Sequence, residues 1–323
     1  MNIILPQIIL SVTFMSVYSE SMIPAVKKGT IIMAKKKAGS YAIPYLITIF
    51  LGLLIVGGAA YFIYNYLGYG KPKELTTPTP RNVQITTYDD NHTILFVLEE
   101  PDTKSPYSFM LMRSIPKDKK LLFIGIPTNT IAVVDGQQSS IQGAYETGGM
   151  TSALAFTEQV FGVTVDRYMK LQSDSLIKIC DIFGGVTYAV PSDTVGFNSD
   201  GSEQYLNAEQ IEKLVTYPMY ADGEVQRAYT MSSITAHMIN QTDGMRISDN
   251  FDNSFSAIIN MTDSNITAVD YREHKVAIKN MFERGSSIAS FLVMDGTDSY
   301  GDFIPSQSFI NNVVDTYFNQ ESK

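Results

Sequence analysis

The 323-residue chain is 45% hydrophobic and 18% charged, a composition typical of proteins that bury a core. Its formal net charge of −9 is unevenly divided, because residues 1–70 carry +4 and residues 71–323 carry −13. The acidic C-terminal part argues against a nucleic-acid partner, which requires a basic face. The single cysteine, Cys180, excludes an intrachain disulfide, and the three scattered histidines lack the spacing of a zinc site.

Met1–Tyr18 is apolar, but no basic residues precede this stretch, as they would in a signal peptide, and Pro6, Glu20 and Pro24 interrupt the pattern. Met33 is followed by an alanine and three lysines, which is a natural beginning for a membrane protein. We interpret residues 1–32 either as an extended start, with Met33 the true first residue, or as a weak extra span that begins at Met1. Residues 33–42 would then form a cytoplasmic basic segment.

Residues 43–67 are expected to form a single transmembrane helix. Ile43–Tyr64 carries no charge over 22 residues, which gives about 33 Å of helix against a hydrocarbon core of ~30 Å. Lysines precede this stretch, so its N-terminal side should face the cytoplasm. We expect a single-pass protein of the cytoplasmic membrane, with a linker at residues 68–83 and a C-terminal domain outside the cell.

The C-terminal domain is expected at residues 84–318, before a tail at 319–323. Short apolar runs bounded by turn residues predict strands at Ile94–Leu98, Ser108–Arg113, Leu121–Ile126 and Ile131–Val134. The loop Pro127–Thr130 follows the third run at its carboxyl end, where open α/β sheets hold their ligands. Residues 141–149 are expected to form a loop that leads into a helix at Ser152–Phe161.

The second half of the chain alternates helical and strand patterns. Cys180 falls on the apolar face of a helix expected at Ser173–Phe183, so we interpret it as a core residue and not as a nucleophile. Asn207 begins a helix with a capping-box pattern, and Pro218 ends it. The remaining expected elements are strands at Val165–Leu171 and Ile288–Met294, with helical faces at Phe251–Ile259 and Ile310–Tyr317.

Motifs in this order resemble those of a known family. Ile126, Pro127 and Thr130 are similar to a loop that reads Ser-Ile-Pro-Arg-Asp-Thr, and Ala144, Tyr145, Gly148 and Gly149 are similar to Ile-Asn-x-Ala-Tyr-x-x-Gly-Gly. The set resembles the LytR-CpsA-Psr family, envelope proteins that attach lipid-linked glycopolymers to the bacterial cell wall. The resemblance covers residues 84–318 and implies an α/β fold with a mixed central β-sheet flanked by helices.

The charged residues that the family places on phosphates are largely replaced in this chain. Thr128 and Asn129 stand where the family has arginine and aspartate, and Ser108 stands where it has another aspartate. Tyr217–Met219 replaces a further arginine pair, which leaves Arg227 as the nearest equivalent of the family's later arginines.

Three carboxylates are similar in position to the family's acidic residues. Glu99 and Asp102 follow the first strand, so the resemblance makes them candidate ligands for Mg²⁺ if the protein is active. Asp181 matches an aspartate of the family's Val-Asp-x-x-Gly-Gly-Val segment. Because it lies in the last turn of a helix, it opposes the helix dipole, and we favour a structural role with a compensating donor over a catalytic one.

The resemblance implies transfer of a phosphoglycosyl chain from a polyprenyl-pyrophosphate carrier to a peptidoglycan hydroxyl. Positioning and charge stabilisation carry most of the catalysis of phosphoryl transfer, so the lost charges predict a catalytically reduced protein that acts by binding. Its partner would be a polyprenyl-phosphate lipid, a wall glycopolymer or an active relative. A working transferase is the alternative, with displaced catalytic groups at Glu99, Glu100, Asp102, Asp135, Asp181 and Arg227.

The resemblance also implies an apolar tunnel for the lipid chain. If it persists, we expect walls from the methionine-rich second strand, since methionine adapts to irregular ligands, and from the neighbouring helix faces. The residues expected to bind the lipid are Phe109, Met110, Met112, Tyr145, Phe156, Val160, Leu176 and Ile179. A third interpretation, a cytoplasmic transcription attenuator, disagrees with the expected topology and with the acidic domain.

Overall fold

The computed structural model describes residues 86–134, 136–192, 194–198, 200–284 and 287–319. These residues belong to a unit that spans Pro80–Lys323. The membrane helix expected at residues 43–67, its basic flank and the linker lie outside the described residues. Within the described ranges, no helix is long and apolar enough to cross a bilayer.

A six-stranded mixed sheet forms the centre of the domain, in the order β10-β3-β2-β1-β6-β9. β1 pairs parallel with β6 and β10 pairs parallel with β3, whereas the pairs β1–β2, β2–β3 and β6–β9 are antiparallel. The strand bounds are β1 His92–Glu99, β2 Pro106–Ile115, β3 Lys120–Ile126, β6 Arg167–Gln172, β9 Asp263–Ser264 and β10 Ala289–Val293. The mixed central sheet expected from the resemblance is confirmed.

Three two-stranded hairpins lie beside this sheet. They are β4 Ile131–Val134 with β5 Gln137–Ser140, β7 Val186–Ala189 with β8 Glu203–Leu206, and β11 Gly296–Ser299 with β12 Asp302–Pro305. Two 3₁₀ turns, η1 Tyr88–Asp90 and η2 Pro116–Asp118, precede β1 and β3. An isolated bridge from Thr130 to Phe303 joins the loop after β3 to β12.

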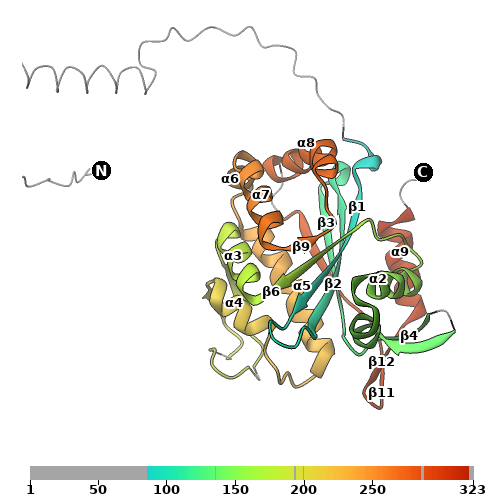
Figure 1. Ribbon diagram of the computed structural model, residues 1–323. Helices are drawn as coiled ribbons and strands as arrows, with labels where there is room; N and C mark the ends of the chain where they lie inside the picture. Colours follow the sequence, from blue (N-terminus) through green and yellow to red (C-terminus); the bar gives the residue numbers. More distant parts are fainter. Residues whose placement is uncertain (1–85, 135, 193, 199, 285–286, 320–323) are drawn as a thin grey trace, which may run out of the picture. The chain divides into compact units, whose positions relative to one another are not determined.

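Helices cover both faces of the central sheet (Figure 1). α2 and α9 lie on one face, and the helices α3 to α8 gather on the other, as the figure shows. The bounds are α2 Ile141–Phe161, α3 Ser173–Phe183, α4 Ala208–Val215, α5 Gly223–Gln241, α6 Gly244–Asp249, α7 Phe251–Met261, α8 Ala268–Arg284 and α9 Gln307–Tyr317. The expected bounds of β4 and α3 are met in full.

The segment 141–149 differs from its expectation, because it is helical and not a loop. Ser140 caps α2 at its start by accepting a hydrogen bond from the backbone nitrogen of Gly143, at 3.0 Å. Gly149 then interrupts the helix with φ 63° and ψ −151°, a conformation that L side chains rarely adopt. The glycine pair therefore marks a kink between two helical pieces, and not the beginning of the helix.

Side chains alternate along the strands between two apolar clusters. Leu111 on β2 packs with Phe156 of α2 in one cluster, whereas Met110 packs with Leu176 of α3 in the other. Gly125 on β3 brings α5 close to the sheet, because an added Cβ would lie 2.0 Å from the carbonyl oxygen of Ala228. The absence of a side chain at Gly125 therefore sets the distance between α5 and the sheet.

Candidate functional site

The loop after β3 is fixed by hydrogen bonds at both of its ends. Thr130 is fully buried, and its hydroxyl donates to the carbonyl oxygen of Pro127 at 2.7 Å. The side-chain amide of Asn129 donates to the carbonyl oxygen of Gly301 at 2.8 Å. The backbone nitrogen of Phe303 donates to the carbonyl oxygen of Asn129 at 3.0 Å. The side chain of Asn129 thus holds the β11–β12 turn, a structural role.

Thr128 and Arg227 meet at a shared carboxylate, that of Glu224 on the first turn of α5. The Thr128 hydroxyl donates to Glu224 Oε2 at 2.9 Å, and Arg227 Nε donates to the same oxygen at 3.1 Å. The remaining guanidinium nitrogens donate to the carbonyl oxygens of Tyr217 and Pro218, at 2.7 and 3.4 Å. Arg227 is only 7% exposed. Its charge is therefore engaged within the protein, with a carboxylate beside it.

A second polar group lies where β1 ends. Glu99 is buried and accepts a hydrogen bond from the hydroxyl of Tyr145 on α2. Burial, and then the bond to Glu99, raise the pKa of Tyr145 well above its usual value, so this tyrosine is a donor at neutral pH. Ser108 on β2 is also buried, and its hydroxyl has no hydrogen-bond partner among the described residues.

Glu99 and Asp102, the two residues expected to hold Mg²⁺, lie in different surroundings. Asp102 lies in an exposed turn, whereas Glu99 is buried and bonded to Tyr145. Within the described parts of the chain, no group of three or more His, Cys, Asp or Glu side chains could hold a metal ion. Asp181 is exposed in the last turn of α3, and no described donor compensates it, unlike our expectation.

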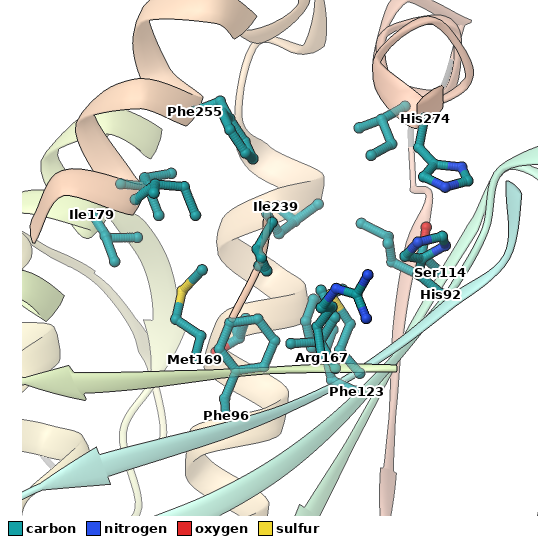
Figure 2. A pocket seen from close by; sticks show the side chains of 18 of the residues that line it. His92, Phe96, Ser114, Phe123, Arg167, Met169, Ile179, Ile239, Phe255 and His274 are labelled. Carbon is teal, nitrogen blue, oxygen red and sulfur yellow. The ribbon is translucent and has the colours of Figure 1, made fainter. Parts of the chain in front are cut away.

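An apolar cavity of about 280 Å³ lies between the sheet and the helices α3, α5, α7 and α8. Figure 2 shows Phe96 and Met169 of the sheet below it, with Ile179, Ile239 and Phe255 on the helices around it. Further wall residues come from β1, β2, β3 and β6, from the helix faces and from the loop before α8: Ile94, Met110, Met112, Phe123, Leu171, Leu176, Met231, Ile258, Ile266 and Phe282.

Polar and charged groups occur at one end of this apolar cavity. The rings of His92 and His274 lie 3.9 Å apart between centroids, and His274 Nδ1 is 3.3 Å from Asp90 Oδ1 (Figure 2). Burial, and then the neighbouring His274, lower the pKa of His92 below its usual value. Arg167 pairs with Asp270 of α8 through Nε at 2.8 Å and Nη2 at 2.5 Å, which holds β6 to α8.

Comparison with known proteins supplies the family. A model of the LytR_cpsA_psr family matches residues 69–303, most of the chain. The chain belongs to the LytR-CpsA-Psr family.

Among curated LytR-CpsA-Psr relatives, the chain is 26% identical to the polyisoprenyl-teichoic acid–peptidoglycan teichoic acid transferase TagU of Bacillus licheniformis, over 83% of this chain and 90% of that protein. A crystallised protein from Eubacterium siraeum matches with a TM-score of 0.65 at 22% identity, over 76% of this chain and 98% of that one. TagT, solved bound to LI-WTA, matches with a TM-score of 0.56 at 15% identity, over 71% of this chain and 89% of that one. These two structures support the fold alone.

The eight residues expected to bind lipid in this LytR-CpsA-Psr domain divide between the two faces of the sheet. Met110, Met112, Leu176 and Ile179 line the apolar cavity. The other four lie in the cluster on the opposite face or pack against it: Phe109, Tyr145, Phe156 and Val160. The physical reason is strand alternation, since Phe109 must face away from the side that Met110 faces.

Sequence reasoning also missed several polar residues of the LytR-CpsA-Psr domain. Lys104, Lys170 and Lys178 line a separate polar cleft of about 750 Å³, next to Glu99. They come from a turn, a strand and a helix that are distant in the sequence. No motif connects them, and only the pairing of β1 with β6 brings them together.

Proposed function

We propose that this LytR-CpsA-Psr protein is anchored in the cytoplasmic membrane by residues 43–67 and works outside the cell as a lipid-binding, catalytically reduced member of the family. The apolar cavity is the observation that carries the proposal. The ligand class is a polyprenyl-phosphate lipid, free or linked to a wall glycopolymer. The name of the TagU relative, polyisoprenyl-teichoic acid–peptidoglycan teichoic acid transferase, supports this class.

The composition of the cavity suits a long isoprenoid chain. Away from its polar end, its wall is mainly aliphatic, aromatic and thioether, and it lies between the central sheet and several helices. Methionines 110, 112, 169 and 231 contribute flexible side chains that adapt to an irregular ligand. Native mass spectrometry of the detergent-extracted full chain should detect a bound prenyl lipid. Filling the cavity with Met112→Trp should remove that lipid, whereas Leu111→Met on the opposite face should not.

The catalytic reduction is argued from electrostatics. In the loop after β3, Thr128 offers one hydroxyl where a guanidinium would bind two phosphate oxygens, and that hydroxyl is already bonded to Glu224. The nearest arginine, Arg227, is engaged by the same carboxylate and by two carbonyl oxygens. Loss of one such donor commonly lowers a rate by roughly two to three orders of magnitude. We therefore expect no measurable transfer from a polyprenyl-pyrophosphate glycopolymer to peptidoglycan.

A gain-of-charge variant tests the electrostatic argument. Thr128→Arg with Asn129→Asp should raise pyrophosphate affinity only weakly, because Glu224 would pair with the new arginine. Adding Glu224→Gln to that pair of changes should raise the affinity further, since the competing carboxylate is gone. Glu224→Gln alone is the control. Transfer by the unmodified chain at the rate of an active relative would establish instead the second candidate, a transferase that uses displaced groups such as Glu99 and Arg227.

The proposed topology has an independent test. Glu209 is exposed on α4, and a Glu209→Cys variant would place a reactive thiol on the domain surface. The native Cys180 contributes little background, because it is fully buried and burial raises its pKa to about 12. We expect a membrane-impermeant maleimide to label the Glu209→Cys variant in intact cells. Labelling only after lysis would place the domain inside the cell.

A further inference from the structure

We propose that the polar cleft lined by Lys104, Lys170 and Lys178 binds the phosphate or pyrophosphate head of an isoprenoid lipid whose chain occupies the apolar cavity. This inference rests on the proposed lipid-binding function and adds to it the place of the anionic head. The cleft lies beside Glu99, on the opposite side of β1 from the loop at Thr128.

The cleft is located at the carboxyl ends of two parallel neighbours, β1 and β6. Glu99 pairs with Gln172 at this end of the strands, and both residues line the cleft. In α/β sheets, ligands bind in the crevice outside the carboxyl ends of parallel strands. The cleft has a volume of about 750 Å³, and Lys104, Asp174 and Lys178 of its lining are exposed, so a bulky head and a glycan beyond it have room.

The same elements form both the cleft and the apolar cavity. On β6, Leu171 lines the cavity and Gln172 the cleft; on α3, Leu176 and Ile179 line the cavity and Lys178 the cleft. On α7, Ile258 and Ile259 line the cavity, and the last two residues of the helix, at 260 and 261, line the cleft together with the following Thr262. An apolar space and a polar space that share three elements match the two parts of an amphiphile.

The charges in the cleft leave two lysines available to an anion. Lys170 Nζ is 2.6 Å from Asp263 Oδ2, and Glu99 accepts from Tyr145, so these groups are already engaged. Lys104 and Lys178 are exposed, and neither forms an ion pair with another described residue. Asp174 is the remaining carboxylate of the lining.

Local structure fixes where Lys104 is presented. It has φ 61° in the turn between β1 and β2, and its backbone nitrogen donates to the carbonyl oxygen of Glu100 at 3.0 Å. Lys178 projects from α3, a regular helix that follows β6 directly. Lysine binds phosphate as a point charge, without the planar fork of arginine. Two such lysines from different elements supply charge that the loop at Thr128 lacks.

The experiment compares three probes on the full-length chain in detergent, without added metal. Geranylgeranyl pyrophosphate has both head and chain, geranylgeraniol has the chain alone, and inorganic pyrophosphate has the head alone. We expect geranylgeranyl pyrophosphate to bind more tightly than geranylgeraniol, and inorganic pyrophosphate to compete with it. The double variant Lys104→Ala with Lys178→Ala should bind geranylgeranyl pyrophosphate about tenfold or more weakly, while its affinity for geranylgeraniol should be unchanged. Lys213→Ala, at an exposed helical lysine outside the cleft, is the matched control.

The outcomes separate this inference from the function on which it rests. Equal affinity of the double lysine variant and the unmodified chain for geranylgeranyl pyrophosphate would overturn the head site, even if geranylgeraniol still binds. Binding of neither lipid, together with lysine-dependent binding of inorganic pyrophosphate, would support an anion site in this cleft and refute the lipid-binding function.

Discussion

The two faces of the central sheet carry similar apolar residues, but the helices pack tightly against one face and leave a cavity on the other. Under α2 and α9, Leu111 and Phe156 are almost completely buried in a packed cluster. On the other face, Met112 and Ile94 are only partly buried and border the apolar cavity. Adjacent positions on one strand therefore contribute to a packed core and to the wall of a cavity. A hydrophobic run in the sequence does not distinguish these roles.

The helices show the same contrast. α2 buries seven residues, including Tyr145, Ala153 and Phe156, whereas no residue of α7 is buried. α7 nevertheless presents Phe251 and Phe255 to the cavity, and Phe255 stacks on Tyr271 of α8 with 4.3 Å between ring centroids. An amphipathic helix that buries none of its apolar side chains fully is a poor core element. It suits a wall whose packing is completed by a ligand.

The largest expected effect comes from neighbouring substitutions on β2. Leu111→Ala should lower the free energy of unfolding by about 2–5 kcal/mol, because it leaves a void in a closed cluster. Met112→Ala should cost about 1 kcal/mol or less, since its side chain already borders empty space. Chemical denaturation of the full chain in detergent measures both changes. Equal costs would show that the cavity face is packed as tightly as the other.

A smaller effect is expected where α5 crosses the sheet. Gly125→Ala places a Cβ 2.0 Å from the carbonyl oxygen of Ala228, so α5 must move away. We expect a loss of about 1–3 kcal/mol from this overpacking, and weaker lipid binding because a wall of the cavity shifts. Gly143→Ala in α2, whose Cβ would meet only Ser140 Oγ at 3.2 Å, is the control and should be close to neutral. A neutral result for both would contradict the close contact.

Much of the fold follows from local patterns in the sequence. Short apolar runs located β1, β2, β3 and β4, and 3.6-residue periodicity with a terminal glycine located α3. The family was identified correctly. The segment 141–149 proved helical and not a loop, since a glycine pair indicates a kink as readily as a helix start. The assignment of side chains to faces failed for Phe109 and Phe156, because it depends on strand register and sheet order, which are long-range properties.

The replaced residues of the candidate site could be named from the sequence, but their contacts could not. Thr128 and Ser108 could be recognised as neutral replacements from their positions in the motifs. The pairing of Arg227 with Glu224 could not, because the same spacing of three residues on a helix occurs in many exposed ion pairs. The lysines of the polar cleft share no sequence neighbourhood, so only the fold reveals them.

A still smaller effect should follow from the ion pair between Arg167 and Asp270, at the polar end of the cavity. Arg167, the largest influence, lowers the pKa of Asp270 well below its usual 3.8 by hydrogen bonding to the carboxylate. A depressed pKa contributes stability that is present above pH 3.8 and is lost as the pH falls further, through the folded-state pKa. Asp270→Asn should cost about 1–2 kcal/mol at pH 7 and should flatten the acid limb of the stability curve. Thermal unfolding from pH 7 to pH 3 measures it, with Asp249→Asn on α6 as an exposed control.

The smallest effect should distinguish the polar end of the cavity from the rest of its wall. The pKa of His92 lies below 6.5, first because the ring is buried and second because His274 is adjacent, while Asp166 acts in the opposite direction. The unfolded chain therefore binds a proton more readily than the folded one. Stability from the neutral ring is present above pH 6.5 and declines as the pH falls through the folded-state pKa.

His92→Phe should remove this decline in the free energy of unfolding, which amounts to less than about 1 kcal/mol between pH 7 and pH 5.5. His237→Phe, outside the cavity wall, should retain it. If the pH dependence of the free energy of unfolding were unchanged in the His92 variant and lost in the His237 variant, the titrating group would lie near His237 and not at the polar end of the cavity.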